Sequence, residues 1–263
     1  MTDQHTSTNT LQGVQKAFTV VTALQELDGA GVSALADHLE IPPSTAQVHL
    51  NTLHQAGYVL KDDGTYRLSL KFLKHGSYAR RQLGLYRAAK RHIDELAEET
   101  GEAANLGVEQ RGKRVLVYKS ESPARAVYDN APTGEQTHLH WTALGKALLS
   151  AMSDDRVDAI VDEHGLPRAN QHTITDREAL HEELHRTRER GYSVEDQDRR
   201  KGILALGVPI VDDATGSVVG AVCVSGPRTR LWDDGVADDV VEAVQNAANV
   251  IELRYNHYIS GGQ

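Results

Sequence analysis

Cysteine is nearly absent from the sequence. The one cysteine, Cys223, has no second thiol with which to form a disulfide or a cysteine-based zinc site, as is typical of a protein from a reducing compartment. Long apolar runs are also absent, because no stretch of about 18 apolar residues occurs. The first ten residues lack the basic and then apolar pattern of a signal peptide. We therefore expect a cytoplasmic protein that does not enter a membrane.

Positive charge is scarce too. The chain has 28 basic and 37 acidic residues, a net charge of −9, and only nine of the basic residues are lysine. Phosphate contacts normally need a basic face, so this balance counts against nucleic-acid binding. The charge is uneven, however, because residues 70–100 carry seven basic and four acidic side chains, a local balance of +3. An acidic, lysine-poor surface suits a salt-rich cytoplasm.

The length and composition allow two compact domains. The 263 residues are 40% hydrophobic, which is enough to bury two cores. Residues 1–10 are polar and show no hydrophobic period, so we expect a disordered tail there. The pattern then changes twice, which predicts a small helical head over residues 11–69, linker helices over 70–101 and a larger domain over 102–263.

The head begins with the pattern of three helices. Apolar residues at three- and four-residue steps predict a first helix with one buried face: Leu11, Val14, Phe18, Val21, Leu24 and Leu27. Ser33 is expected to cap a short second helix. Pro42 and Pro43 break the chain, and Pro43 is suited to the first turn of a third helix that reaches about residue 55.

A hairpin follows these helices. Short strands are predicted at residues 58–60 and 66–68, and Asp63-Gly64 between them is typical of a tight turn. Three helices followed by a hairpin predict a winged helix-turn-helix.

The C-terminal part mixes strands and helices. Strands are expected at residues 105–109, 115–119, 204–211 and 218–225. Helices are expected at residues 143–152, 155–164, 176–190 and 236–258. Thr175 with Glu178 is expected to form a capping box at the start of the third of these helices. The fold class is therefore α+β.

The third helix of the head has a polar, uncharged face. Asn and Gln can pair with adenine, an exposed Val48 can pack on a thymine methyl group, and no arginine is present there for guanine, so we expect A·T-containing DNA half-sites. Lys61 and Arg67 on the hairpin are expected to contact phosphates or the minor groove. The candidate DNA-binding residues are Ser33, Pro43, Ser44, Thr45, Gln47, Val48, Asn51, Thr52, Lys61 and Arg67.

Several segments resemble the IclR-type (isocitrate lyase regulator) transcription factors, from about residue 11 to residue 258. The similar segments occupy residues 41–45, 53–59, 66–68, 142–149, 173–176, 188–193 and 225–227. The resemblance implies a winged helix head, a linker helix that pairs heads into dimers or dimers of dimers, and a GAF-like domain that binds a small metabolite. The acidic composition fits a family member from a haloarchaeon.

The resemblance also implies a pocket. Its expected lining is Ala143, Leu144, Gly145, Glu195, Ala205, Cys223 and Ser225. A carboxylate ligand would gain from backbone N–H groups at the start of the helix after Trp141. The chain departs from the family's pattern at Ala205, where a cysteine is frequent, at Cys223, where a serine is frequent, and at Val48, where a basic residue is frequent. The first two departures predict a less polar pocket, which favours a larger organic acid, such as a sugar acid or an aromatic acid.

One motif suggests a different class of protein. His181-Glu182-Glu183-Leu184-His185 spells the H-E-x-x-H zinc pattern, which would fit a metal-dependent hydrolase with an accessory winged helix. The two histidines lie at the edge of the predicted buried stripe of that helix, and no third-ligand motif follows them. We therefore expect no metal site, no cofactor and no enzyme activity, and instead a homo-oligomeric regulator that binds double-stranded DNA and a small effector.

Overall fold

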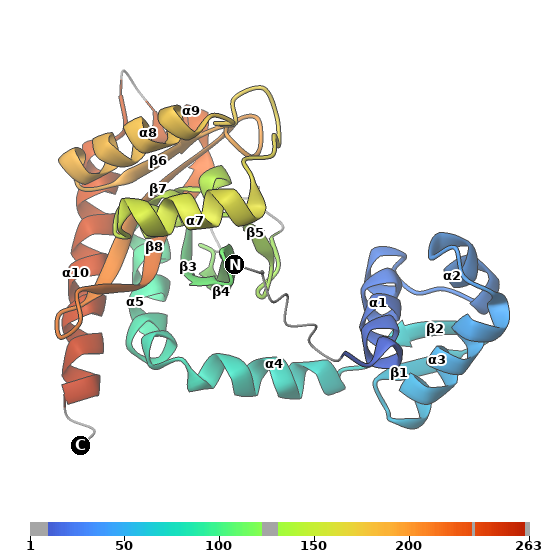
Figure 1. The fold of residues 1–263 in the computed structure, drawn as a ribbon. Coiled ribbons are helices and arrows are strands. Elements are labelled where there is room, and N and C mark those ends of the chain that lie inside the picture. Colours follow the sequence, from blue (N-terminus) through green and yellow to red (C-terminus); the bar gives the residue numbers. More distant parts are fainter. Residues whose placement is uncertain (1–9, 123–130, 233–234, 261–263) are drawn as a thin grey trace, which may run out of the picture. The chain divides into compact units, whose positions relative to one another are not determined.

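The structure is a computed structural model that describes residues 10–122, 131–232 and 235–260, so nearly all of the expected tail lies outside the described residues. The chain divides into two compact units, residues 1–79 and 80–263 (Figure 1). In the described part of the chain, no helix combines the length and the hydrophobicity that a membrane span requires.

The first unit is a three-helix bundle with a hairpin. Its elements are α1 (Gln12–Glu26), α2 (Val32–His38), α3 (Pro43–Gln55), β1 (Val59–Asp62) and β2 (Thr65–Leu68). The hairpin turn places Asp63 and Gly64 at φ values of 43° and 80°, and two successive positive φ angles are what a tight two-residue hairpin turn requires. One hydrophobic core, which includes Leu24, Leu35 and Leu50, joins all three helices and both strands. The predicted winged helix-turn-helix is therefore confirmed.

Two predictions about this unit are wrong. The apolar face of α1 is only partly buried, because Leu11 and Phe18 expose 77% and 63% of their surface, while Val20, Ala23 and Leu24 fill the core. The periodicity correctly identified an amphipathic helix, but it could not show which of the apolar residues are buried within the single chain. Ser33 does not cap α2, because the helix already begins at Val32. Gly31 occupies the cap position and makes no side-chain hydrogen bond there.

The helix α4 (Lys71–Gln82) is fastened to the first unit at its start. The Lys71 ammonium donates to the Ala56 carbonyl at 2.7 Å and lies 4.4 Å from the centre of the Tyr58 ring. The Tyr58 hydroxyl and His75 Nε2 are 2.8 Å apart. The first turns of α4 and the hairpin therefore form one body. The next helix, α5 (Gly84–Thr100), was expected within the linker, but its apolar face is buried in the core of the second unit.

The second unit is built on a six-stranded antiparallel sheet. Its strands are β3 (Ala103–Gln110), β4 (Lys113–Ser120), β5 (Gln136–His138), β6 (Ser193–Asp196), β7 (Ile203–Asp212) and β8 (Ser217–Pro227). Their order is β5-β4-β3-β8-β7-β6, so the first and last strands are neighbours at the centre. The sequence predicted four of these strands and missed the two short edge strands β5 and β6, the second of which ends in two acidic residues.

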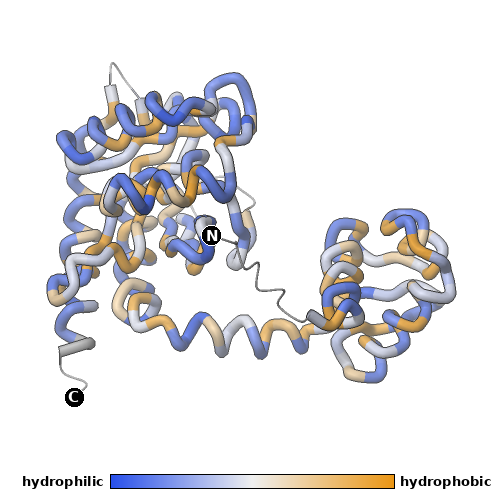
Figure 2. Tube along the Cα trace, viewed as in Figure 1, coloured by the Kyte–Doolittle hydropathy of each residue, from blue (hydrophilic) through white to orange (hydrophobic). Residues whose placement is uncertain are grey.

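Helices cover both faces of the sheet (Figure 1). On one face, α5 and α10 (Asp238–Ser260) pack against inward residues such as Leu106 and Val222. On the other face lies α6 (Ala143–Ser150), which follows the short 3-10 helix η1 (Leu139–Trp141) and is covered by α7 (Asp154–His164) and α8 (Arg177–Arg190). The short α9 (Arg228–Leu231) follows β8. Hydrophilic residues predominate along α8, as expected for an outer helix (Figure 2).

The alternation of side chains along the central strands decides which residues face α6. On β8, Val222 and Val224 face α5 and α10, whereas Cys223 belongs to the core beneath α6. Asn105 on β3 is directly opposite Cys223, so it shares this face. One predicted cap is corrected in this region: Asp176, and not Thr175, caps α8 by accepting a hydrogen bond from the amide of Ala179 at 3.0 Å.

Candidate functional site

The outer face of α3 carries most of the predicted DNA-binding residues. Pro43 and Ser44 in its first turn and Val48, Asn51 and Thr52 further along are exposed, and Val48 exposes 63% of its surface. Thr45 and Gln47 are half-buried at the edge of this face. Ser33 is exposed as well, but it stands on the first turn of α2.

The polar groups of this face are held in place by hydrogen bonds. The Gln47 amide donates to Asn51 Oδ1 at 2.7 Å and to the Tyr66 hydroxyl at 3.0 Å. Tyr66 is itself buried in the core, and its hydrogen bond from Gln47 lowers the pKa of the phenol. Gln47 therefore ties the exposed Asn51 side chain to the hairpin, and Asn51 keeps one further lone pair on Oδ1 and two amide hydrogens beyond this contact.

The two predicted phosphate contacts lie on the hairpin. Lys61 and Arg67 are both exposed, and the Lys61 ammonium is 5.2 Å from the centre of the Tyr66 ring. The Arg67 side chain packs beside Gly29, where a Cβ atom would lie 2.7 Å from Arg67 Cγ. Arg67 is thus held along its stem and Lys61 at its ammonium group, while both side chains remain exposed.

The second unit contains a cavity of about 40 Å³ between α6 and the sheet. Six of the seven predicted pocket residues line it: Ala143, Leu144, Glu195, Ala205, Cys223 and Ser225. Gly145 does not, and its role is steric, because a Cβ atom there would collide with the carbonyl of Leu139. Residues as far as 82 positions apart in the sequence therefore meet at one cavity, with α6 on one side and β7 and β8 on the other.

Sequence reasoning missed several lining residues. These are Asn105, Arg114, Leu116, Ala131, Thr142, Arg199, Arg200 and Ile203. Strand alternation could have found two of them, because Asn105 and Arg114 occupy inward positions of β3 and β4. Arg199 and Arg200 lie in an irregular loop before β7, where no periodic pattern gives their direction.

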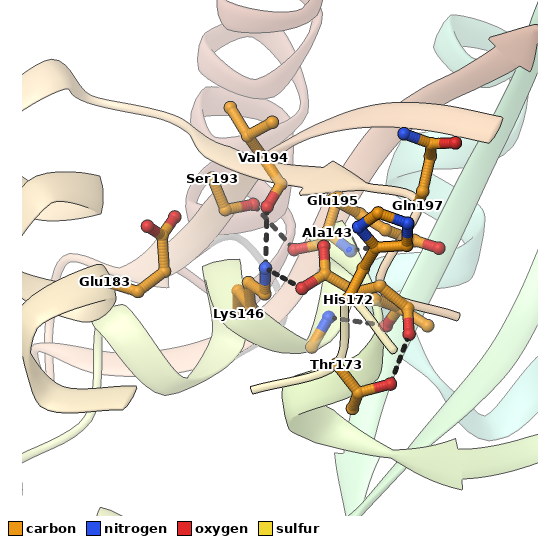
Figure 3. A network of polar contacts seen from close by, with 12 residues as sticks. Ala143, Lys146, His172, Thr173, Glu183, Ser193, Val194, Glu195 and Gln197 are labelled. Atoms are coloured by element: carbon orange, nitrogen blue, oxygen red, sulfur yellow. Dashed lines mark hydrogen bonds and ion pairs between the residues drawn. The ribbon is translucent and has the colours of Figure 1, made fainter. Parts of the chain in front are cut away.

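Glu195 lies at the centre of a buried polar network (Figure 3). One of its carboxylate oxygens accepts a hydrogen bond from the amide of Ala143 at 3.2 Å. Burial raises the pKa of Glu195 to about 7, and the negative charge of Asp198 adds to this effect, while Lys146 and the Ala143 amide oppose it. Glu195 can therefore be neutral or ionised near neutral pH.

Lys146 balances part of this buried negative charge. Its ammonium is 3.1 Å from Asp198 Oδ1 and donates to the Val194 carbonyl at 2.9 Å (Figure 3). Burial raises the pKa of Asp198, and its ion pair with Lys146 acts in the opposite direction. Because Lys146 sits on α6 and Asp198 follows β6, the network also fixes α6 against the edge of the sheet.

Two backbone amides at the start of α6 already donate hydrogen bonds within the protein. The Ala143 amide donates to Glu195, and the Gly145 amide donates to the Thr142 hydroxyl at 3.1 Å. In this structure Glu195 thus takes the place that sequence reasoning expected for a ligand carboxylate, at the positive end of the helix. An anionic ligand at these amides would have to displace Glu195 or meet it in its neutral form.

The mouth of the cavity holds a cationic cluster. Arg114 is buried and donates to the Thr137 hydroxyl at 3.0 Å and to Glu135 at 3.0 Å. Arg199 donates to the other oxygen of Glu135 at 2.6 Å. Two guanidinium groups thus share one carboxylate, so Arg114, Arg199 and Glu135 together carry one positive charge, opposite in sign to that of ionised Glu195 in the same cavity.

The two histidines of the H-E-x-x-H motif lie on α8 and make separate contacts. His181 forms a hydrogen bond with Asp158 at 3.0 Å between α8 and α7, and His185 is exposed. Across residues 10–122, 131–232 and 235–260, no cluster of three or more His, Cys, Asp or Glu side chains could hold a metal ion. The two histidines therefore belong to the polar surface of α8.

Comparison with known proteins gives matches to both units. The IclR helix-turn-helix domain matches residues 13–63, and the C-terminal domain of the bacterial transcriptional regulator IclR matches residues 78–253. The "Probable HTH-type transcriptional regulator ArcR" of Halobacterium salinarum is 32% identical over 247 residues, which cover 93% of this chain and 94% of the relative.

Solved structures share the fold. The crystal structure of Thermotoga maritima IclR matches with a TM-score of 0.77 and 25% identity, over 93% of this chain and 99% of that chain. An IclR homologue from Microbacterium hydrocarbonoxydans, solved in complex with 4-hydroxybenzoate, matches with a TM-score of 0.74 and 22% identity, over 92% of this chain and 99% of that chain.

These matches decide between the two classes of protein that the sequence left open. The family and the similar proteins are transcriptional regulators and not enzymes, so the alternative of a metal-dependent hydrolase is wrong. The order of the two matched domains is that of the head and the larger unit described above. The chain belongs to the IclR family of transcriptional regulators.

Proposed function

We propose that the head binds double-stranded DNA through α3 and the hairpin, and that a small organic or sugar acid bound in the cavity of the second unit controls this binding. The observation that carries the proposal is the combination, in one chain, of an exposed polar recognition face and a partly open cavity with charged walls. The protein then acts in the cytoplasm, where its DNA lies.

Base readout is assigned to the outer face of α3. Asn51, which Gln47 positions, can pair with adenine, and exposed Val48 can pack on a thymine methyl group, so we propose A·T-containing half-sites. Lys61 and Arg67 supply phosphate contacts from the hairpin. The full proposed DNA-binding set is Ser33, Pro43, Ser44, Thr45, Gln47, Val48, Asn51, Thr52, Lys61 and Arg67.

The effector is assigned to the cavity beneath α6. Its proposed contacts are Ala143, Leu144, Glu195, Ala205, Cys223 and Ser225, with Gly145 shaping the start of the helix. The positive charge at Arg114 and Arg199 favours an acid, and the relative solved with 4-hydroxybenzoate supports this class of ligand.

The size of the cavity gives a physical route to regulation. A volume of about 40 Å³ holds only a few water molecules, since one water needs about 10–15 Å³. An organic acid of six or more heavy atoms must therefore move the lining, of which α6 is one wall. A ligand that binds the expanded form of the second unit more tightly than the unexpanded form shifts the equilibrium between these two forms. Such a difference in affinity is required for a ligand to change how the head binds DNA.

We further propose that the protein is a homodimer that can pair into a dimer of dimers. Support comes from apolar side chains that the single chain leaves exposed on the helices of the first unit and its linker. On α1 and before and along α4 these are Leu11, Val14, Phe18, Leu70, Leu73 and Tyr78. Exposed apolar stripes of this kind mark surfaces that a partner covers.

The test is a DNA gel shift with the upstream region of the protein's own gene, at several salt concentrations and with added organic acids. Asn51→Ala should weaken binding about 5- to 150-fold, because a bidentate base contact is worth about 1–3 kcal/mol. Gln25→Ala, at an exposed position of α1, is the matched control. A shift by Asn51→Ala like that of the unaltered protein would contradict the assigned face, and no release by any acid would contradict the assigned effector class.

A further inference from the structure

Asn105 is a buried polar residue of the cavity wall whose hydrogen bonds are incomplete. It stands on β3, exposes 4% of its surface and lines the cavity together with Cys223 and Ser225. Its Nδ2 group donates to the Ser225 hydroxyl at 3.1 Å and lies 3.6 Å from Cys223 Sγ. Its Oδ1 atom accepts no hydrogen bond from any residue that the structure describes.

An unpaired buried acceptor is unfavourable for the folded state. Removing a carbonyl oxygen from water without a replacement donor costs about 1–3 kcal/mol, and such groups are rare in native proteins. An apolar residue of similar size on β3 would avoid this cost, since the same face of the sheet carries Ala205 and Ala221. The position is explained if the missing donor arrives with a ligand.

The surroundings of Oδ1 identify the kind of donor. A carboxylate cannot serve, because it would place one acceptor against another. An ammonium group would be attracted only by the ionised form of Glu195 and would be repelled by Arg114 and Arg199, which line the same cavity. A neutral hydroxyl fits, since it can donate to Asn105 and also accept from or donate to the Ser225 hydroxyl or Glu195, which line the same cavity.

The acid group of the same ligand would bind at a different part of the cavity from its hydroxyl group, near Arg114. Arg114 reaches the cavity from β4, where its strand partner is Glu109, four residues along β3 from Asn105. Four residues of a strand span about 13 Å, part of which the long arginine side chain covers. The cavity thus offers a cationic end and a hydroxyl-accepting end on one face of the sheet.

We propose that Asn105 is a specificity-determining residue that accepts a hydrogen bond from an effector hydroxyl, so that the pocket selects hydroxy acids over the same acids without the hydroxyl. This inference rests on the proposed effector site and adds the class of ligand to it.

The first test compares matched acids by calorimetry on the full-length protein: 4-hydroxybenzoate with benzoate, and 3-hydroxybutyrate with butyrate. For the pair that binds, the hydroxy acid should bind about 10-fold or more tightly, because sites built to hydrogen-bond a hydroxyl discriminate strongly against its absence. Asn105→Leu, and Asn105→Ala as a variant without added bulk, should reduce this preference to within about two-fold. A preference that survives in both variants would overturn the proposal.

The second test needs no ligand and measures the melting temperature of the empty protein. Asn105→Leu removes an unpaired acceptor, so its melting temperature should equal or exceed that of the unaltered protein. The matched control is Thr173→Val, at a buried hydroxyl that accepts two backbone amides and donates to the Asp198 carbonyl, and this variant should melt several degrees lower. An equal or larger loss for Asn105→Leu would assign Asn105 a structural role and overturn the proposal.

The two tests also separate this inference from the proposed function. If none of the four acids binds the unaltered protein, the assigned effector class fails for these probes. The melting temperatures still decide whether the unpaired Oδ1 atom of Asn105 destabilises the folded protein. If the acids bind without regard to their hydroxyl, the effector site stands and the role of Asn105 is refuted.

Discussion

The buried carboxyl of Glu195 should make the stability of the second unit depend on pH. Burial raises its pKa from the ordinary value of 4.5 to about 7. The folded state therefore holds this proton more tightly than the unfolded state, and its stabilising effect is complete below pH 4.5 and is lost as the pH rises through 7. A difference of about 2.5 pKa units corresponds to about 3 kcal/mol.

The variant Glu195→Gln isolates this effect, because a glutamine oxygen can still accept the Ala143 amide but cannot ionise. At pH 4.5 the two proteins should unfold with similar free energies. At pH 8 the glutamine variant should be more stable by about 3 kcal/mol, since only the unaltered protein must then bury a charge beside Asp198. Glu182→Gln, at an exposed position of α8, controls for the substitution itself.

Urea unfolding followed by tryptophan fluorescence measures the free energy of unfolding of the second unit. Both tryptophans of the chain, Trp141 and Trp232, belong to the second unit, so the signal reports its unfolding and not that of the head. The salt concentration is kept constant over the pH series. A free-energy difference between Glu195→Gln and the unaltered protein that stays constant from pH 4.5 to pH 8 would refute the reasoning.

Three further predictions concern the head, the subunit contact and the start of α6. Lys61→Ala should lower the slope of log K against log salt in DNA binding by about one, with unchanged base preference; an unchanged slope would remove Lys61 from the phosphate contacts. Phe18→Asp should dissociate the dimer and weaken the gel shift, because the exposed ring on α1 would be replaced by a charge; sedimentation that still shows a dimer would exclude this surface. Gly145→Ala should lower the urea midpoint of the second unit, because its Cβ atom would collide with the Leu139 carbonyl, and a midpoint like that of the unaltered protein would show that α6 can shift freely.

The sequence was most informative where local chemistry determines local structure. The turn at Asp63-Gly64 and the break at Pro42-Pro43 require particular backbone angles, and both appear where the residues predicted them. The exposed face of α3 likewise follows from helical periodicity once its buried residues Ala46 and Leu50 are known.

The sequence was least informative where distant segments decide the outcome. The periodicity of α1 is the same whether Leu11 and Phe18 face the chain's own core or a partner, so their exposure could not be read from it. The position of Arg114 beside Arg199 depends on Glu135, which binds both side chains, and no local pattern reports such a meeting. Six lining residues of the cavity were nevertheless identified, because they followed from the family's motifs and not from spacing.

The central pairing of β3 with β8 has a consequence for how the protein is made. The Asn105 amide meets the Ser225 hydroxyl across 120 positions of sequence, so the floor of the cavity cannot form until β8 has been synthesised. Such non-local pairing folds slowly, whereas the head consists of near neighbours in sequence and can fold as soon as it leaves the ribosome. A nascent chain thus completes its head early and the cavity of its second unit last, so a chain truncated before β8 would retain the head but lack the cavity.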